Sequence, residues 1–165
     1  MKAKDRKINL LMVDDEVDFL TPLAQRLESR DFQVTTATEG KSAVKAAEKG
    51  GFDVAVLDLE MPGMNGIELL QILKKNHNFL EVIILTGHGR VATYKEAKKL
   101  GAFSYLEKPF DMDELLEKLK DAYHIRLKRK FEKDKKRQEA LDILGMGASP
   151  LAILRSLMSM DDDEK

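Results

Sequence analysis

Short apolar segments alternate with amphipathic segments along the first 121 residues, and this alternation is what most constrains the fold. The apolar segments have the length of buried strands and cover residues 8–13, 32–36, 53–57, 82–85 and 103–106. The segments between them carry apolar residues at helical spacing and cover residues 17–30, 40–49, 67–73, 90–100 and 111–121. Strands that alternate with helices predict an α/β fold: a doubly wound, five-stranded parallel sheet, (βα)5, with helices on both faces.

The remaining residues, 122–165, differ in composition from this α/β unit. Residues 124–139 carry a net charge of +5, against −3 for residues 1–121, although the whole chain is at −1. The stretch is free of Gly and Pro, which predicts that the fifth helix continues as one helix from Asp111 to Leu144. We therefore divide the chain into a domain of residues 1–121 and a helical C-terminal extension of residues 122–165.

Within the extension, few apolar residues fall in 124–139, which predicts a solvent-exposed, charge-rich helix rather than a long coiled coil. Gly145-Met146-Gly147 is expected to end this helix. Ser149-Pro150 then predicts the start of a short apolar helix that runs to Met160, followed by the acidic end 161–165.

Composition excludes several classes of function. The chain has no Cys, so disulfides, thiolate catalysis and Cys-based metal sites are impossible, and its three His residues lack ligand-like spacing. The apolar run of residues 8–13 is too short for a signal peptide or a membrane span, which predicts a cytoplasmic protein without membrane contact. A net charge near zero disfavours a globally basic nucleic-acid binder.

Five polar residues directly follow predicted strands: Asp14 and Asp15, Asp58, Thr86 and Lys108. Ligands of open α/β sheets bind at this edge, outside the carboxyl ends of the strands. Carboxylates at about 5 Å repel by roughly 3 kcal/mol per pair at an effective dielectric near 20, so such a cluster recruits a cation, and its oxygen ligands suit Mg²⁺. The nearby ammonium and hydroxyl groups suit a phosphoryl group, with Asp58 as the nucleophile that forms an acyl phosphate.

Each of these residues also has an ordinary structural explanation. A single Asp after a strand is usually a turn or cap residue, a Thr there is usually a helix cap, and Lys-Pro is usually a loop. Their joint occurrence at four strand ends favours a functional site.

The sequence resembles the response-regulator receiver domains of two-component signalling over about residues 6–121. The motifs that carry the resemblance are, in order, Val13-Asp14-Asp15-Glu16, Asp58-Leu59-Glu60-Met61-Pro62-Gly63-Met64-Asn65-Gly66, Ile84-Leu85-Thr86-Gly87 and Lys108-Pro109-Phe110. The resemblance implies the strand order 2-1-3-4-5 and a cis peptide bond between Lys108 and Pro109. It also implies that the chain is not an enzyme in its own right, beyond Mg²⁺-dependent phosphorylation and dephosphorylation of itself.

The resemblance also assigns roles to the residues of the candidate site. Asp58 is similar to the phosphoacceptor, Asp15 to the direct Mg²⁺ ligand and Asp14 to the ligand that acts through water. Asp58 and the backbone carbonyl of Glu60 are similar to the remaining protein ligands of the metal. Lys108 is similar to the residue that pairs with a phosphoryl oxygen.

The resemblance assigns two residues to switching, and we assign the timing of the switch to two residues near the site. Thr86 resembles the switch hydroxyl, and Tyr105 resembles the aromatic residue that turns inward when Thr86 moves. Glu60 and His88 lie two residues past Asp58 and Thr86, so we expect their side chains to flank the path of the hydrolytic water and to set the lifetime of the phosphorylated state. The alternative is that both side chains point into solvent.

The resemblance implies a sensor histidine kinase or a phosphotransfer protein as the phosphoryl donor and protein–protein contact as the output. The contact could be a homodimer formed through the face of the fourth helix, fifth strand and fifth helix, or through the C-terminal helices. Two alternatives remain open: a compact DNA-binding transcriptional regulator that uses residues 122–165, and a Mg²⁺-dependent phosphate-transferring enzyme. The basic run 126–137 is the feature that keeps the first of these open.

Overall fold

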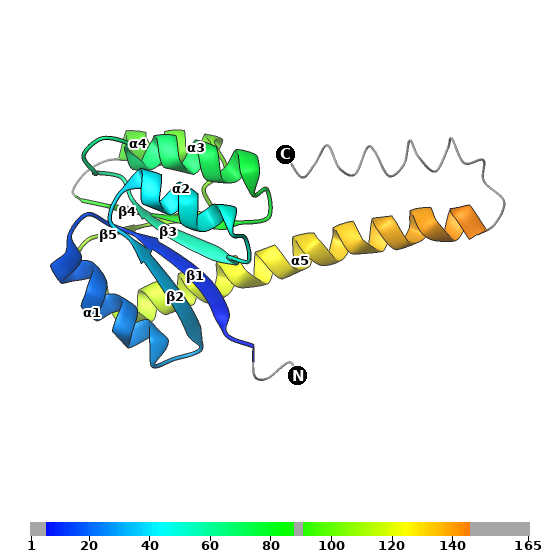
Figure 1. The fold of residues 1–165 in the computed structure, drawn as a ribbon, viewed down its shortest axis with the longest axis horizontal. Helices are drawn as coiled ribbons and strands as arrows, with labels where there is room; N and C mark the ends of the chain where they lie inside the picture. The colour runs from blue at the N-terminus through cyan, green and yellow to red at the C-terminus, as the bar shows by residue number, and fades with distance from the viewer. Residues whose placement is uncertain (1–5, 88–90, 146–165) are drawn as a thin grey trace.

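The computed structural model describes residues 6–87 and 91–145, and in it strands and helices alternate as predicted (Figure 1). The strands are β1 (Ile8–Val13), β2 (Phe32–Ala37), β3 (Val54–Asp58), β4 (Glu81–Thr86) and β5 (Ser104–Glu107). The helices are α1 (Val17–Glu28), α2 (Gly40–Glu48), α3 (Gly66–Asn76), α4 (Val91–Lys99) and α5 (Met112–Gly145). His88, the short helix predicted after Ser149-Pro150 and the acidic end 161–165 lie outside the described residues.

The five strands form one parallel sheet in the order β2-β1-β3-β4-β5, which confirms the doubly wound fold and the strand order implied by the resemblance. The register pairs Val13 with Leu57 and Asp58 with Leu85. The carboxyl ends of β1, β3 and β4 therefore lie next to one another at the same edge of the sheet.

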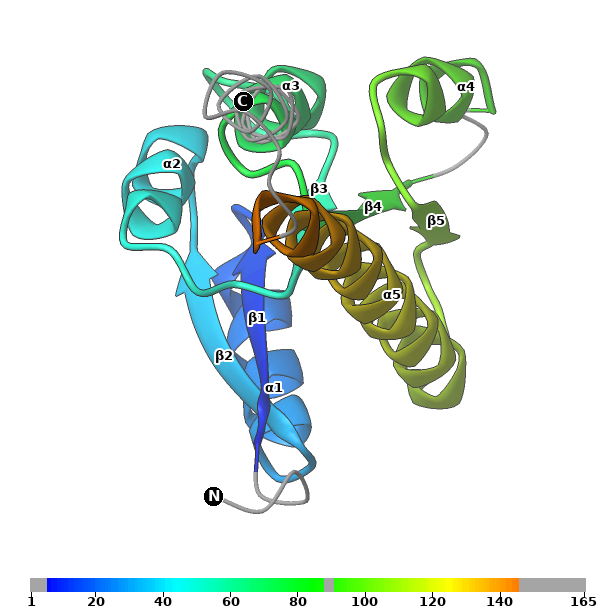
Figure 2. The same cartoon turned by 90° about the vertical axis from the view of Figure 1, so that its right-hand side faces the viewer.

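Two apolar layers hold the sheet between the helices, because successive strand residues point to opposite faces. Leu10 and Met12 of β1 pack with α1 and α5, whereas Leu11 and Val13 pack with α2, α3 and α4. Figure 2 shows this division, with α2, α3 and α4 on one side of the sheet and α1 and α5 on the other. Both faces of the central strands are buried, which explains their uninterrupted apolar sequence.

Helix α5 is 34 residues long, and each of its ends lies one residue from the end of the single helix predicted from Asp111 to Leu144. At about 1.5 Å per residue its length is close to 50 Å, and its second half extends beyond the sheet (Figure 1). Among the described helices, we find none with a stretch long and apolar enough to cross a lipid bilayer.

Two arginines attach the extension to the amino-terminal ends of the central strands. The Arg126 Nε–H donates to Asp53 Oδ1 at 2.9 Å, directly before β3, and an Arg129 Nη–H donates to Glu81 Oε1 at 2.6 Å, at the first residue of β4. Asp53 and Glu81 are both buried. Most residues of 124–139 are exposed, as predicted for a charge-rich helix, but on one side of these turns two buried carboxylates draw Arg126 and Arg129 onto the sheet.

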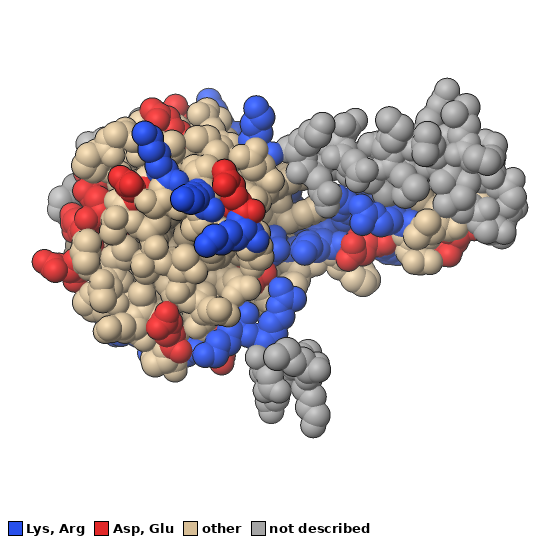
Figure 3. Space-filling view, in the orientation of Figure 1, with Lys and Arg blue, Asp and Glu red and all other residues tan. Residues whose placement is uncertain are grey.

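Figure 3 shows the resulting charge distribution on one face of the molecule. Lys and Arg side chains gather where α5 leaves the sheet, and acidic side chains are more frequent at the opposite end of the α/β unit. The arginine ion pairs at one end and the predicted carboxylate site at the other thus occupy opposite ends of the same parallel strands.

Candidate functional site

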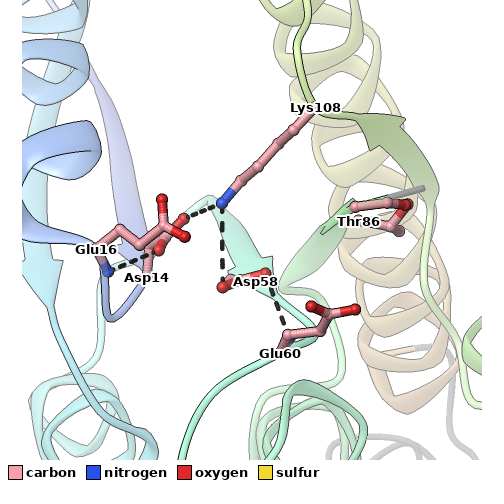
Figure 4. A network of polar contacts seen from close by, with 7 residues as sticks. Asp14, Glu16, Asp58, Glu60, Thr86 and Lys108 are labelled. Atoms are coloured by element: carbon pink, nitrogen blue, oxygen red, sulfur yellow. Dashed lines mark hydrogen bonds and ion pairs between the residues drawn. The ribbon is translucent and has the colours of Figure 1, made fainter.

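The polar residues predicted from the strand ends converge at one edge of the sheet (Figure 4). Asp14 follows β1, Asp58 and Thr86 are the last residues of β3 and β4, and Lys108 follows β5. Asp14, Asp58 and Thr86 are buried. The parallel strands thus bring together residues that are up to 94 positions apart in the sequence.

Three carboxylates form the acidic part of the site. One carboxylate oxygen from each of Asp14, Asp15 and Asp58 lies within 4.8 Å of the other two, and Asp15 is the most exposed of the three residues. Oxygen-only donors gathered in a partly buried position fit a hard divalent cation such as Mg²⁺. The donor set therefore suits the metal that the sequence predicts.

Backbone amides hold two of these carboxylates in place. The Glu16 N–H donates to Asp14 Oδ1 at 2.9 Å, and this turn leads directly into α1. The Glu60 N–H donates to Asp58 Oδ1 at 3.3 Å, so the backbone of Glu60 lies beside the site, while its side chain is exposed.

Lys108 extends from the end of β5 toward Asp14 and Asp58 (Figure 4). Its Nζ donates to Asp14 Oδ2 at 2.7 Å and lies 4.0 Å from Asp58 Oδ2. Its backbone N–H donates to the Thr86 carbonyl at 2.8 Å, which fixes the end of β5 beside β4. The peptide bond between Lys108 and Pro109 is cis, as the resemblance implies.

Burial and crowded charge shift the ionisation of both partners. Burial raises the pKa of Asp58 to about 6, and the negative charge of Asp14 adds to this, while Lys108 and the Glu60 N–H act in the opposite direction. Burial acts to lower the pKa of Lys108, but its hydrogen bond and ion pair with Asp14 and the charge of Asp58 outweigh burial, so this pKa is raised. Lys108 is therefore a stable cation beside a carboxyl that resists ionisation.

The residues expected to switch lie beside the site but are not aimed at its carboxylates. The Thr86 hydroxyl donates to the Gly87 carbonyl at 2.9 Å. Tyr105 is half-buried, and its ring packs against that of Tyr94 with 4.1 Å between centroids and a tilt of 43°. Tyr94 was not predicted, because α4 has a weak apolar pattern and nothing in its sequence indicates a partner for Tyr105.

Sequence reasoning also missed Phe19 and Gly66. The Phe19 ring lies 4.4 Å from Lys108 Nζ. A Cβ on Gly66 would lie 2.5 Å from the Asp58 carbonyl oxygen and 2.7 Å from Leu59 Cα, so only glycine allows this close approach of the β3–α3 loop. Gly66 is the last residue of the Asp58–Gly66 motif, and its place in that motif is the sequence feature that could have indicated its steric role.

Comparisons with known proteins cover the α/β unit that carries this site. Residues 10–120 match the family described as response regulator receiver domain. A putative NtrX-like response regulator of Rickettsia bellii is 34% identical over 138 residues, which cover 82% of this chain and 27% of that protein. Sporulation initiation phosphotransferase F of Bacillus subtilis is 34% identical over 111 residues, which cover 67% of this chain and 90% of that protein.

Solved structures show the same similarity in three dimensions. The receiver domain of NtrX from Brucella abortus superimposes with a TM-score of 0.67 at 33% identity and covers 70% of this chain and 98% of that one. This chain spans about a quarter of the length of the NtrX-like relatives that it matches. On the family match and these relatives together, the chain belongs to the response regulator receiver domain family.

Proposed function

We propose that this chain is a phosphorylation-controlled switch in which Asp58 accepts a phosphoryl group from a histidine kinase or a phosphotransfer protein. The observation that carries the proposal is the convergence of three carboxylates and a lysine at one strand edge, with carboxylate oxygens within 4.8 Å and Lys108 Nζ 4.0 Å from Asp58 Oδ2. This arrangement combines a nucleophile, a place for a divalent cation and a fixed positive charge.

Asp14, Asp15, Asp58 and the Glu60 backbone carbonyl would hold Mg²⁺, which supplies positive charge to neutralise the transferred group when it is bound. A carboxylate oxygen of Asp58 attacks phosphorus, the new O–P bond gives an acyl phosphate, and the P–N bond to the donor histidine breaks with its electron pair returning to the imidazole. Lys108, already held at the edge of the site, then pairs with a phosphoryl oxygen.

The response would begin at Thr86. Phosphorylation adds about −1.5 to −2 charges and new acceptor oxygens at Asp58. The Thr86 hydroxyl, which donates to the Gly87 carbonyl in this structure, would turn to a phosphoryl oxygen, and the space that it leaves would admit Tyr105. The face formed by α4, β5 and α5 would change as a result.

Glu60 and His88 are proposed to set the lifetime of the phosphorylated state. The exposed side chain of Glu60, next to the backbone that contacts Asp58, supports this role for Glu60. Glu60→Ala should change the dephosphorylation rate, and an unchanged rate would remove Glu60 from the proposal. The same measurement on His88→Ala tests His88.

The output that we favour is protein–protein contact, including a homodimer through the α4-β5-α5 face or the C-terminal helices, in a cytoplasmic setting. Arg126 and Arg129 are held in ion pairs with buried carboxylates, so two cations of the basic run are already paired within the molecule. Sedimentation of the full chain, with and without beryllofluoride and Mg²⁺, tests the dimer. Salt-dependent binding to DNA would instead support the transcriptional alternative.

The phosphoryl transfer itself is tested by incubating the full chain with phosphoramidate and Mg²⁺ and mapping the modified residue by mass spectrometry. We expect one phosphoryl group, on Asp58, and none on Asp58→Asn. Equal labelling of the Asp58→Asn variant would refute the proposal, and multiple turnover of a phosphomonoester substrate would favour an enzyme instead.

A further inference from the structure

The ammonium group of Lys108 lies over an aromatic ring as well as beside a carboxylate. Its Nζ is 4.4 Å from the centroid of the Phe19 ring, well inside the range of about 6 Å in which a cation is attracted to the face of a ring. The same Nζ donates to Asp14 Oδ2 at 2.7 Å. The lysine is therefore held by two different groups of the β1–α1 segment.

The Phe19 ring is itself fixed by its surroundings. Phe19 lies in the first turn of α1, where its backbone N–H donates to the Glu16 carbonyl at 3.1 Å, and its ring is half-buried. The Phe110 ring meets it edge-on, with 6.0 Å between centroids and an interplanar angle of 86°. Phe110 follows Lys108 by two residues, so the segments that carry the carboxylate and the lysine also supply the two rings.

A ring is a suitable partner for a lysine that must serve a second group. The lysine side chain is a flexible four-carbon stem, which without contacts samples many positions in solvent. An ammonium has three N–H donors and no acceptor. The ring face attracts the cation without accepting one of these N–H groups in the way a carboxylate does, so the donors stay available for Asp14 and for an oxygen on Asp58.

We propose that Phe19 is a positioning residue for Lys108, whose ring holds the ammonium at the edge of the carboxylate site and so speeds phosphoryl transfer to Asp58. This inference rests on the proposed function for its effect on rate. The contrasting explanation is that Phe19 only fills space, since Phe19 and Phe110 both pack against the apolar layer under α1 and α5. The test must therefore separate the ring's attraction for a cation from its volume.

Three variants of the full chain make this separation. Phe19→Leu keeps an apolar side chain but removes the ring, Phe19→Tyr keeps the ring, and Phe52→Leu removes another half-buried ring that lies at the other end of the sheet. With phosphoramidate and Mg²⁺, we expect Phe19→Leu to be phosphorylated about three- to ten-fold more slowly than the natural chain. Phe19→Tyr and Phe52→Leu should stay within about two-fold of it.

A second measurement reads the contact directly and needs no phosphorylation. In NMR spectra of the natural chain, the ring current of Phe19 should shift the Lys108 Hε protons upfield, and this shift should persist in Phe19→Tyr and disappear in Phe19→Leu. The natural chain alone tests the contact, so the measurement stands even where Phe19→Leu does not fold.

Three results would overturn the inference: no upfield shift of the Lys108 protons in the natural chain, a Phe19→Leu rate within about two-fold of the natural rate, or a Phe19→Tyr rate as low as that of Phe19→Leu. Failure of the proposed function has a different signature, namely that phosphoramidate does not modify Asp58 in the natural chain. The ring-current shift would then still decide whether Phe19 positions Lys108.

Discussion

Removing Arg126 from its ion pair with Asp53 should be strongly destabilising, because it leaves a buried carboxylate without this partner. Asp53 is 1% exposed, and its side chain accepts the Arg126 Nε–H and the backbone N–H of Asn9, each at 2.9 Å. Arg126→Met removes the charge and keeps a long apolar side chain, so its main effect is to leave a buried carboxylate without its nearest cation.

The size of the effect follows from what remains around Asp53. Removal of one partner from a buried ion pair typically costs about 3–5 kcal/mol. Here the Asn9 N–H stays in place, and the guanidinium of Arg6, on a largely exposed side chain, lies 3.6 Å from Asp53 Oδ1. Because these groups compensate in part, we expect Arg126→Met to lower the free energy of unfolding by about 2–3 kcal/mol.

Urea unfolding followed by far-UV circular dichroism measures this loss, since the chain has no Trp to report by fluorescence. Lys128→Met, on an exposed position of the same helix, is the matched control and should change stability by no more than about 0.5 kcal/mol. In the Asp53→Asn background, Arg126→Met should cost at least about 1 kcal/mol less. Equal losses for Arg126→Met and Lys128→Met, or the same loss in both backgrounds, would refute the reasoning.

Three further predictions concern the carboxylate site. Asp58→Asn should raise the unfolding free energy of the metal-free protein at pH 8 by up to about 3 kcal/mol, since folding raises the pKa of Asp58 from 3.8 to about 6. In the natural chain, the stability contributed by the protonated carboxyl is fully present below about pH 4 and is lost as the pH rises through 6. In urea unfolding, the gain of Asp58→Asn over the natural chain should therefore vanish near pH 4. A gain that does not depend on pH would contradict this prediction. Mg²⁺ at ten times its Kd should stabilise the chain by about 1.4 kcal/mol, measured by thermal unfolding. The Asp15→Asn variant should lose this stabilisation. If the variant keeps it, Asp15 is not part of the metal site. Gly66→Ala should lower the free energy of unfolding by about 2 kcal/mol or more, because the added Cβ would meet backbone atoms. Gly87→Ala is the control, since a Cβ added at that position would have no atom of the described residues within 4 Å. Equal effects of the two substitutions would exclude the steric explanation.

Much of the fold could be predicted because apolar periodicity reports burial directly. Strands buried on both faces have uninterrupted apolar sequences, and the absence of Gly and Pro marked the continuation of α5. The strand order came from the family resemblance, since periodicity does not say which strands are neighbours. The contacts of Arg126 and Arg129 were not predictable, because a basic residue on a helix gives no signal of a buried acid on a distant strand.

The site was predictable where the chemistry depends on backbone position. Asp14 and Lys108 follow strands and Asp58 ends one, and a parallel sheet brings strand ends together whatever their side chains. The direction of the Thr86 hydroxyl and the contact of Phe19 with Lys108 depend on rotamers and on packing between α1 and the loop after β5. An apolar residue in an amphipathic helix is predicted to be buried, but the sequence pattern does not show which side chain that residue will contact.

The carboxylate site and the Arg126–Asp53 ion pair lie at opposite ends of β3, and this separation leads to a last prediction. Asp53 and Asp58 are five residues apart on an extended strand, which corresponds to about 17 Å. Mutations separated by more than about 10 Å without shared partners usually add to within about 0.5 kcal/mol. The loss from Arg126→Met and the gain from Asp58→Asn should therefore sum in the double variant, measured by urea unfolding at pH 8 without Mg²⁺. A deviation above about 1 kcal/mol would mean that strand β3 couples its two ends and that the extension senses the state of Asp58.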